Sequence, residues 1–198
     1  MKKMNNKGFS LVELIIVIAI MAILAGAIAP ALIRYIDKSR KSNDVSSCKT
    51  IKTAVETALG NETVYEYLTT GDEFCYIYIT PGEATSATEL ADLECITISG
   101  ASTEAEINGK ANADIAKIAE NEIATNIGEK TPKLKYRKNA ADPDGDAPVE
   151  FVAVISNKGT VYVFISTAAE MTVSADENVG VASEAGFQIC PNVCDEYQ

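Results

Sequence analysis

Side chains that could perform chemistry are few in this sequence, and their types restrict what they could do. The chain has 198 residues and no histidine, so neither an imidazole base nor an imidazole metal ligand is present. Serines are numerous, but without histidine none has an evident base to activate it as a nucleophile. The sequence also contains no glycine-rich phosphate loop. It therefore predicts a protein that is not an enzyme and has no cofactor.

Three aspartates at alternate positions, Asp142, Asp144 and Asp146, form a weak candidate for calcium binding, because calcium prefers carboxylate oxygens. The EF-hand pattern is not completed. Ala147 stands where that loop requires glycine, and Ala153 stands where it requires a bidentate glutamate. We interpret the stretch as an acidic surface turn and predict no bound metal.

The odd number of cysteines leaves at least one thiol unpaired within a monomer. The five are Cys48, Cys75, Cys95, Cys190 and Cys194. An exported chain could form two bridges, and buried free thiols are the alternative. Zinc binding by Cys190 and Cys194 has little support, since no histidine or second cysteine pair stands nearby.

One acidic side chain, Glu13, lies inside a long apolar run. Residues 14–29 contain no polar side chain, and roughly 25 residues from Phe9 onward are nearly all apolar, close to the length of a bilayer-spanning helix. Lysines precede the run, and a basic cluster at residues 34–41 follows it. A carboxylate at mid-depth in a membrane helix costs about 2.5–3.5 kcal/mol, so Glu13 is a candidate functional residue.

Three interpretations of this segment compete: a secretory signal peptide cleaved near residues 25–27, a plain membrane anchor, and a chain cleaved after Gly8. In the third, Phe9 becomes the amino terminus, and Glu13 lies one helical turn later on the same face. The Glu13 carboxylate could then pair with the α-amino group of a neighbouring subunit, since charges in an apolar bundle are tolerated when paired. Such a pair would set the register of adjacent helices.

Residues 7–30, KGFSLVELIIVIAIMAILAGAIAP, resemble the class III signal segment of type IV pilins and pseudopilins. The matching features are a basic leader ending in Gly8, then Phe9, then Glu13 as the fifth residue after the cleavage point, then an apolar helix. Gly26 and Pro30 match the helix-loosening residues that the family tends to carry. The resemblance implies that a membrane prepilin peptidase cuts after Gly8 and N-methylates Phe9.

The resemblance also implies a function. The chain is expected to be held in the cytoplasmic membrane as a precursor. A membrane platform and an ATPase would then assemble it with copies of itself into an extracellular pilus (fimbrium) on the bacterial surface. Adhesion and twitching motility are roles of such filaments. A C-terminal loop with two cysteines resembles the often disulfide-closed region of pilins, which makes Cys190–Cys194 a candidate bridge.

Two alternatives stay open. One is a pseudopilin of a type II secretion or competence system, and the other is a secreted binding protein with an ordinary signal peptide. The formal charge of −11 argues against a nucleic-acid partner, because little positive charge is available to neutralise phosphates.

The resemblance and the hydrophobic pattern together predict an α+β fold in which a long N-terminal helix packs on an antiparallel sheet. The expected parts are a cleaved leader (1–8), an apolar membrane and filament-core helix (9–36), and a head (37–198) that includes the amphipathic second half of the helix. Helical spacing places Cys48, Ile51 and Val55 on the buried side, with Asp44, Lys49, Lys52 and Glu56 largely opposite. Pro30 is expected to kink the helix or to melt it near Gly26.

Hydrophobic patterns in the head predict six further elements. These are strands at 74–80, 133–138 and 171–175, helices at 86–95 and 111–128, and a hairpin at 149–167. The hairpin, with Asn157-Lys158-Gly159 at its turn, is expected to be the centre of the sheet.

Overall fold

A computed structural model describes residues 9–81, 95–128, 130–142, 145–167, 171, 173–176, 180–183 and 186–198. The chain divides into two compact units, one ending at Ser39 and the other running from Arg40 to Gln198. The helix expected at 86–95 lies, but for its last residue, outside the described residues, so that prediction is not addressed.

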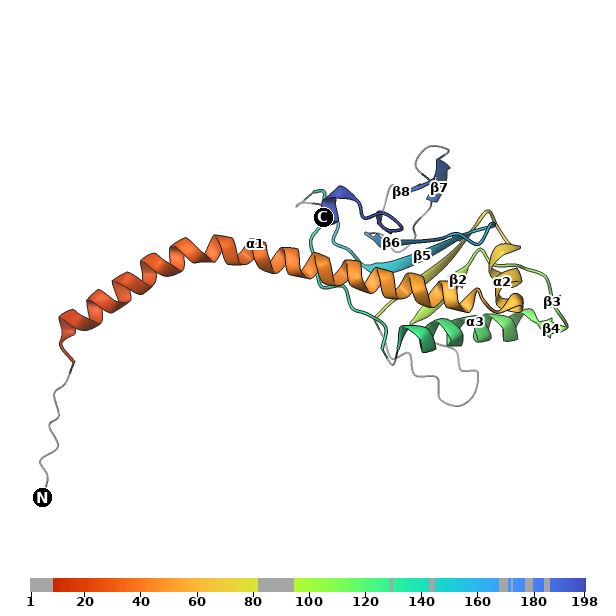
Figure 1. Ribbon diagram of the computed structural model, residues 1–198, viewed down its shortest axis with the longest axis horizontal. Helices are drawn as coiled ribbons and strands as arrows, with labels where there is room; N and C mark the ends of the chain where they lie inside the picture. The colour runs from red at the N-terminus through yellow and green to blue at the C-terminus, as the bar shows by residue number, and fades with distance from the viewer. Residues whose placement is uncertain are drawn as a thin grey trace, which may run out of the picture. The chain divides into compact units, whose positions relative to one another are not determined.

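The long helix is α1, Leu11–Ala58, with 48 residues (Figure 1). It remains helical through Gly26 and Pro30, so of the two effects expected there, a kink or local melting, the melting does not occur in this structure. The helix ends at Ala58, and just beyond it the Gly60 and Asn61 N–H groups donate to the carbonyls of Thr57 and Ala58 at 3.0 and 3.1 Å. These bonds satisfy terminal carbonyls that have no partner within the helix.

The head contains one antiparallel sheet of five strands in the order β2-β1-β5-β6-β9. Figure 1 labels β2, β5 and β6 of this sheet. Its strands are β1 (Phe74–Ile79), β2 (Ile96–Ser99), β5 (Glu150–Ser156), β6 (Val161–Ser166) and β9 (Gly186–Cys190). The predicted hairpin is β5–β6, and β5 is the central strand, so this prediction is confirmed. Gly159 in its turn has a φ of +76°, and a Cβ there would lie 2.8 Å from the Tyr65 ring, so the position requires glycine.

Both faces of the sheet are covered. On one face, Ala153 and Ile155 pack in a core with Ile51 and Val55 of α1 and with helix α3 (Asn112–Ile127). On the other face, Val152, Val154 and Phe164 form a smaller cluster with Met171 and Phe74. This split follows from the alternation of side chains along a strand.

The remaining elements are short. They are α2 (Glu62–Thr69), β3 (Glu106–Ile107), β4 (Lys110–Ala111), β7 (Val173–Asp176), β8 (Gly180–Ser183) and the 3-10 helix η1 (Asp195–Tyr197). The strand expected at 171–175 corresponds to β7, which pairs with β8 in a separate two-stranded sheet. Helix α2 was not expected. Asn61 begins it by accepting a hydrogen bond from Thr63 N at 3.1 Å.

Two expectations about the head were wrong, and they share one cause. Residues 133–138 do not form a strand. The N–H groups of Lys135 and Tyr136 donate instead to Asp44 Oδ1 and Oδ2, each at 2.8 Å. Asp44 was expected on the exposed side of α1, but it is completely buried. Its carboxylate accepts the backbone hydrogen bonds that the carbonyls of a neighbouring strand would otherwise accept.

Candidate assembly site

The first turn of α1 is closed by two reciprocal hydrogen bonds. Ser10 N donates to Glu13 Oε2 at 2.9 Å, and Val12 N donates to Ser10 Oγ at 3.3 Å. This arrangement is a capping box, in which the N-cap serine and the glutamate three residues later satisfy backbone N–H groups. The negative carboxylate also complements the positive end of the helix dipole. Ser10 was not among the predicted site residues, although the pattern Ser-x-x-Glu before an apolar run signals such a cap.

The cap places the Glu13 carboxylate at the end of α1 that follows the predicted cleavage point. Phe9 is next to Ser10 and is highly exposed. Only Oε2 of Glu13 is used by the cap, and a carboxylate can accept about four hydrogen bonds. The other oxygen, Oε1, is not bonded to any residue that the structure describes. The structure thus brings Phe9 and Glu13 to one end of the helix, whereas Gly8 lies outside the described residues.

The apolar first half of α1 has no cover of its own. Of the nineteen large hydrophobic side chains exposed in the described chain, seventeen lie between Phe9 and Ile36. By length and composition α1 could cross a membrane, and none of its most apolar window is buried within the protein. Contiguous apolar surface on this scale marks a site that lipid or protein covers.

Gly26 and Pro30, the two predicted helix-loosening residues, lie within this apolar half. A Cβ added at Gly26 would meet no atom within 4 Å, so the chain's own packing does not require glycine there. Pro30 is tolerated inside α1 despite the hydrogen bond that it removes. Any need for these residues in assembly stays a prediction.

In the head, α1 holds the C-terminal end of the chain through a cluster of polar groups. Lys41 Nζ donates to the Glu196 carbonyl and lies 4.9 and 5.7 Å from the ring centroids of Tyr136 and Tyr197. Burial raises the pKa of Asp44, and its two N–H donors and Lys135 offset part of this effect. Burial likewise raises the pKa of Tyr197. These contacts join residues 91 to 156 positions apart, so no local signal in the sequence could have revealed them.

All five cysteines are free thiols. Cys190 is buried in the same core cluster as Cys48, whereas Cys194 is half-buried at its edge, so the candidate Cys190–Cys194 bridge is not formed. Burial raises the pKa of the Cys75 thiol to about 12 and contributes most to raising that of Cys194 to about 11. Thiols with such values are weak nucleophiles at neutral pH.

The acidic loop shows a turn organised by an amide. Asn139 Oδ1 accepts hydrogen bonds from the N–H groups of Ala141 and Asp142, at 2.9 and 3.1 Å. Within the described residues, no group of three or more cysteine, aspartate or glutamate side chains is placed to hold a metal ion. Asp144 lies outside those residues, so the calcium candidate Asp142–Asp146 is not tested.

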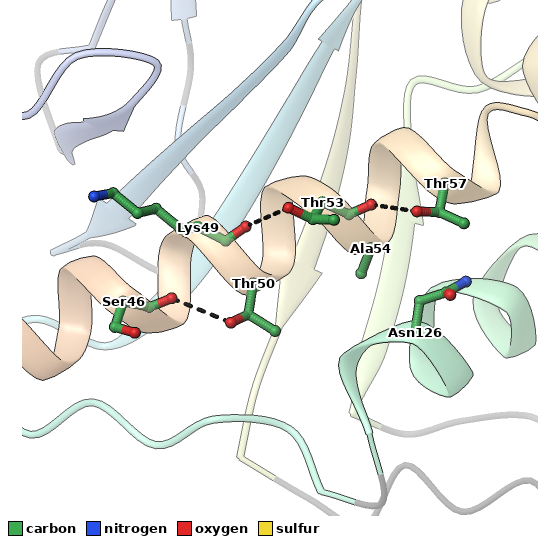
Figure 2. Close-up of a pocket in the computed structure, with 7 residues that line it drawn as sticks. All are labelled: Ser46, Lys49, Thr50, Thr53, Ala54, Thr57 and Asn126. Atoms are coloured by element: carbon green, nitrogen blue, oxygen red, sulfur yellow. Dashed lines mark hydrogen bonds between the residues drawn. The ribbon is translucent and has the colours of Figure 1, made fainter.

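A groove of about 340 Å³ lies between the exposed side of α1 and the end of α3 (Figure 2). It is lined by Ser46, Lys49, Thr50, Thr53, Ala54, Thr57 and Asn126. The hydroxyls of Thr50, Thr53 and Thr57 donate to carbonyls of their own helix at 3.2, 3.1 and 2.7 Å. The groove therefore offers small side chains and one lysine, with no pair of groups suited to acid–base catalysis.

Comparison with known proteins identifies relatives of this chain. Residues 3–29 match the family model described as the prokaryotic N-terminal methylation motif. The chain is 34% identical over 138 residues to a type IV major alpha-pilin of Moraxella bovis, covering 65% of this chain and 86% of that relative. It is 50% identical over 54 residues to fimbrial protein Q of Moraxella bovis. It is 44% identical over 57 residues to the type IV major fimbrial protein FimA of Dichelobacter nodosus.

The extent of these matches differs. The last two cover 34% and 36% of the relatives, whereas the match to the alpha-pilin extends well into the head. No solved structure matches the chain. Three findings agree: a long helix with an apolar first half and a capping glutamate, an antiparallel sheet packed against the second half of that helix, and similarity to a major pilin over 86% of that relative's length. The chain therefore belongs to the type IV pilin family, whose members are structural subunits rather than enzymes.

Proposed function

We propose that this pilin is cut after Gly8, is methylated at Phe9, and is held in the cytoplasmic membrane by residues 9–36 until it polymerises into a surface filament. The observation that carries the proposal is the row of sixteen exposed large apolar side chains on α1, preceded by the exposed Phe9, on a helix whose first turn is capped by the Glu13 carboxylate. Lipid covers this surface before assembly, and the helices of other subunits cover it afterwards. Its partners are other copies of this chain, a prepilin peptidase, an assembly platform and an ATPase.

Glu13 has two separable tasks in this proposal. Its Oε2 closes the helix by accepting the Ser10 N–H, and its charge neutralises the α-amino group of Phe9 on a neighbouring subunit. The first task needs only an oxygen acceptor, but the second needs a negative charge. Removing the charge leaves the neighbour's ammonium group unpaired in an apolar bundle, which costs several kcal/mol.

Glutamine at position 13 separates the two tasks, because it retains the acceptor and lacks the charge. We expect Glu13→Gln to be processed and held in the membrane normally but to lower filament yield at least about tenfold, the effect of 1.4 kcal/mol. Ser10→Ala is the matched control. It removes the serine half of the cap and keeps the charge, so it is expected to retain most filaments.

Filament yield is measured by shearing and electron microscopy, and processing by the mass of the membrane-held chain. Wild-type filament yield from Glu13→Gln would show that the charge is not required. Mass spectrometry of the filament should give N-methyl-Phe9 as the first residue. A mature chain beginning near Ile28 would instead support the secreted binding protein.

A further inference from the structure

Positive charge is strongly segregated in this acidic chain. Nine of the fourteen lysines and arginines after Gly8 come from two short stretches, 34–41 and 130–138, which together contain one acidic residue. They are Arg34, Lys38, Arg40, Lys41, Lys130, Lys133, Lys135, Arg137 and Lys138. The rest of the mature chain carries five cations and 27 acidic residues. A random distribution of charge does not explain this pattern.

Within the head, the fold brings the second stretch beside Arg40, near the end of the first stretch. Residues 133–137 run extended with alternating exposure: Leu134 and Tyr136 are buried, and Lys133, Lys135 and Arg137 are exposed. Asp44 holds the backbone of this segment through two N–H groups. Lys133 and Arg137 form no salt bridge with any residue in the described part of the chain. A fixed backbone therefore presents Lys133 and Arg137 at the surface without an ion-pair partner in the described head.

Two adjoining hollows follow this segment. The first, about 360 Å³, is lined by Arg40, Asn43, Lys133, Leu134, Lys135 and Arg137. The second, about 460 Å³, is lined by Pro81, Lys133, Leu134, Arg137, Ala147, Pro148 and Val149. Because both include Lys133, Leu134 and Arg137, we treat them as one surface, the basic groove. Its cations stand beside an apolar wall that contains Val149, which is 52% exposed.

We propose that the basic groove binds the phosphate headgroup of an anionic phospholipid in the membrane that holds α1, before the subunit is assembled. This inference rests on the proposed membrane-held precursor. Arg40 belongs to α1 and follows Ile36, the last residue of the exposed apolar run, by four residues, or about 6 Å of helical rise. An arginine at that distance from the apolar run reaches the headgroup layer.

The chemistry of the groove suits this ligand. Arginine can bind two phosphate oxygens at once, and lysine and arginine side chains near a membrane are attracted to anionic headgroups. The apolar wall of Pro148 and Val149 is suited to the glycerol and upper acyl region beside the phosphate. An acidic face of a second copy would also attract these cations. The position of Arg40 beside the apolar run favours lipid while the helix is in the membrane.

The absence of tryptophan provides a direct test, since one introduced tryptophan is a unique fluorophore. The reporter is Val149→Trp, at the wall of the groove. The control reporter is Tyr65→Trp on α2. This helix follows the C-terminal end of α1, whereas Arg40 lies at the other end of the α1 segment that belongs to the head. The full mature chain is reconstituted in vesicles that contain a phosphatidylcholine with a nitroxide on its headgroup as quencher. One set is otherwise phosphatidylcholine, and the other contains phosphatidylglycerol.

We expect quenching of Trp at position 149 to be about twofold stronger with phosphatidylglycerol and to weaken at high salt, which screens exposed charges. The control reporter should be quenched little in both sets. In the reporter background, the triple change Lys133→Gln, Lys135→Gln and Arg137→Gln should abolish the difference. The matched triple change Lys49→Gln, Lys110→Gln and Lys158→Gln alters the net charge equally and should leave the difference intact.

Equal quenching in the two vesicle sets would overturn the proposal, as would an equal loss in both triple variants. A position-149 signal that changes with protein density rather than lipid charge would assign the groove to a second copy instead. Near-ultraviolet circular dichroism of the tyrosines confirms that each variant is folded. Flotation of the vesicles confirms that α1 is inserted, so a negative quenching result counts against the groove and not against the proposed membrane-held precursor.

Discussion

The two halves of α1 have the same secondary structure and opposite surroundings. Ile15 in the first half is 51% exposed, whereas Ile51 in the second half is completely buried against the sheet. Each half also contains an acid that accepts backbone N–H groups. Glu13 accepts one from Ser10, three residues away, and Asp44 accepts two from residues 91 and 92 positions away.

This difference teaches where each half obtains its stability. The second half is stabilised by burial within its own chain, because apolar area removed from water contributes about 25 cal/mol per Å². The first half forms its helical hydrogen bonds and its N-terminal cap, but it buries almost no side chain. Its apolar surface must therefore be covered by lipid or by other subunits. The second half thus stabilises the monomer, whereas the first half provides the apolar surface for assembly.

The largest expected effect comes from the same substitution made in each half. Ile51→Ala should lower the free energy of unfolding of the head by about 2–5 kcal/mol, because it leaves a cavity in the core. Ile15→Ala should change it by less than about 0.5 kcal/mol. Denaturant unfolding of the full chain in detergent, followed by the near-ultraviolet signal of the tyrosines, measures both. Equal losses would erase the contrast between the halves.

A smaller effect is expected at the buried acid. Asp44→Asn keeps one acceptor and loses the other, so one of the two N–H groups from residues 135 and 136 is left buried without a partner. We expect a loss of about 1–3 kcal/mol in the same unfolding measurement. Glu56→Gln is the matched control, because Glu56 makes an exposed pair with Lys52 at 2.6 Å and such helix pairs contribute about 0.3–0.5 kcal/mol. A loss no larger than that of the control would mean that Asp44 does not hold the 133–138 segment.

Varying the pH sharpens this test. Burial raises the pKa of Asp44 above its ordinary value, so the folded chain binds this proton more tightly than the unfolded chain. The stabilisation linked to this raised pKa is therefore fully present below the ordinary aspartate pKa of about 3.9. It is lost as the pH rises through the pKa of Asp44 in the folded chain. The unfolding free energy of the wild type minus that of Asp44→Asn should fall across this window. A difference that grows with pH would show that the two N–H donors outweigh burial.

The smallest expected effect is at Gly26, in the exposed half. Gly26→Ala has open space for its methyl group and should stabilise the helix by about 0.5–1 kcal/mol, seen as higher helicity by far-ultraviolet circular dichroism in detergent. If this variant also assembles poorly, the glycine serves contacts or unwinding in the filament. Lower helicity would show instead that the monomer already needs glycine there.

Much of the fold could be predicted because its main elements carry local periodic signals. The spacing of Cys48, Ile51 and Val55 predicted the buried stripe of α1, and the β-rich runs around Gly159 predicted the central hairpin. Strand β9 was not predicted, because its residues follow a glycine- and alanine-rich stretch and become a strand by pairing with β6. Residues 133–138 alternate as a strand does, but a distant carboxylate accepts their hydrogen bonds.

The sequence by itself determined the assembly segment, since its apolar length, its acid and its cap all depend on residues within a few positions of one another. Only the tertiary structure decided that Asp44 is buried, that Cys48 and Cys190 share a core, and that Arg40 lines a groove with Lys133 and Arg137. The physical reason is the range of the interactions. Helix caps and apolar runs are satisfied along the chain, whereas burial and charge clustering depend on which distant segments the folded chain brings together.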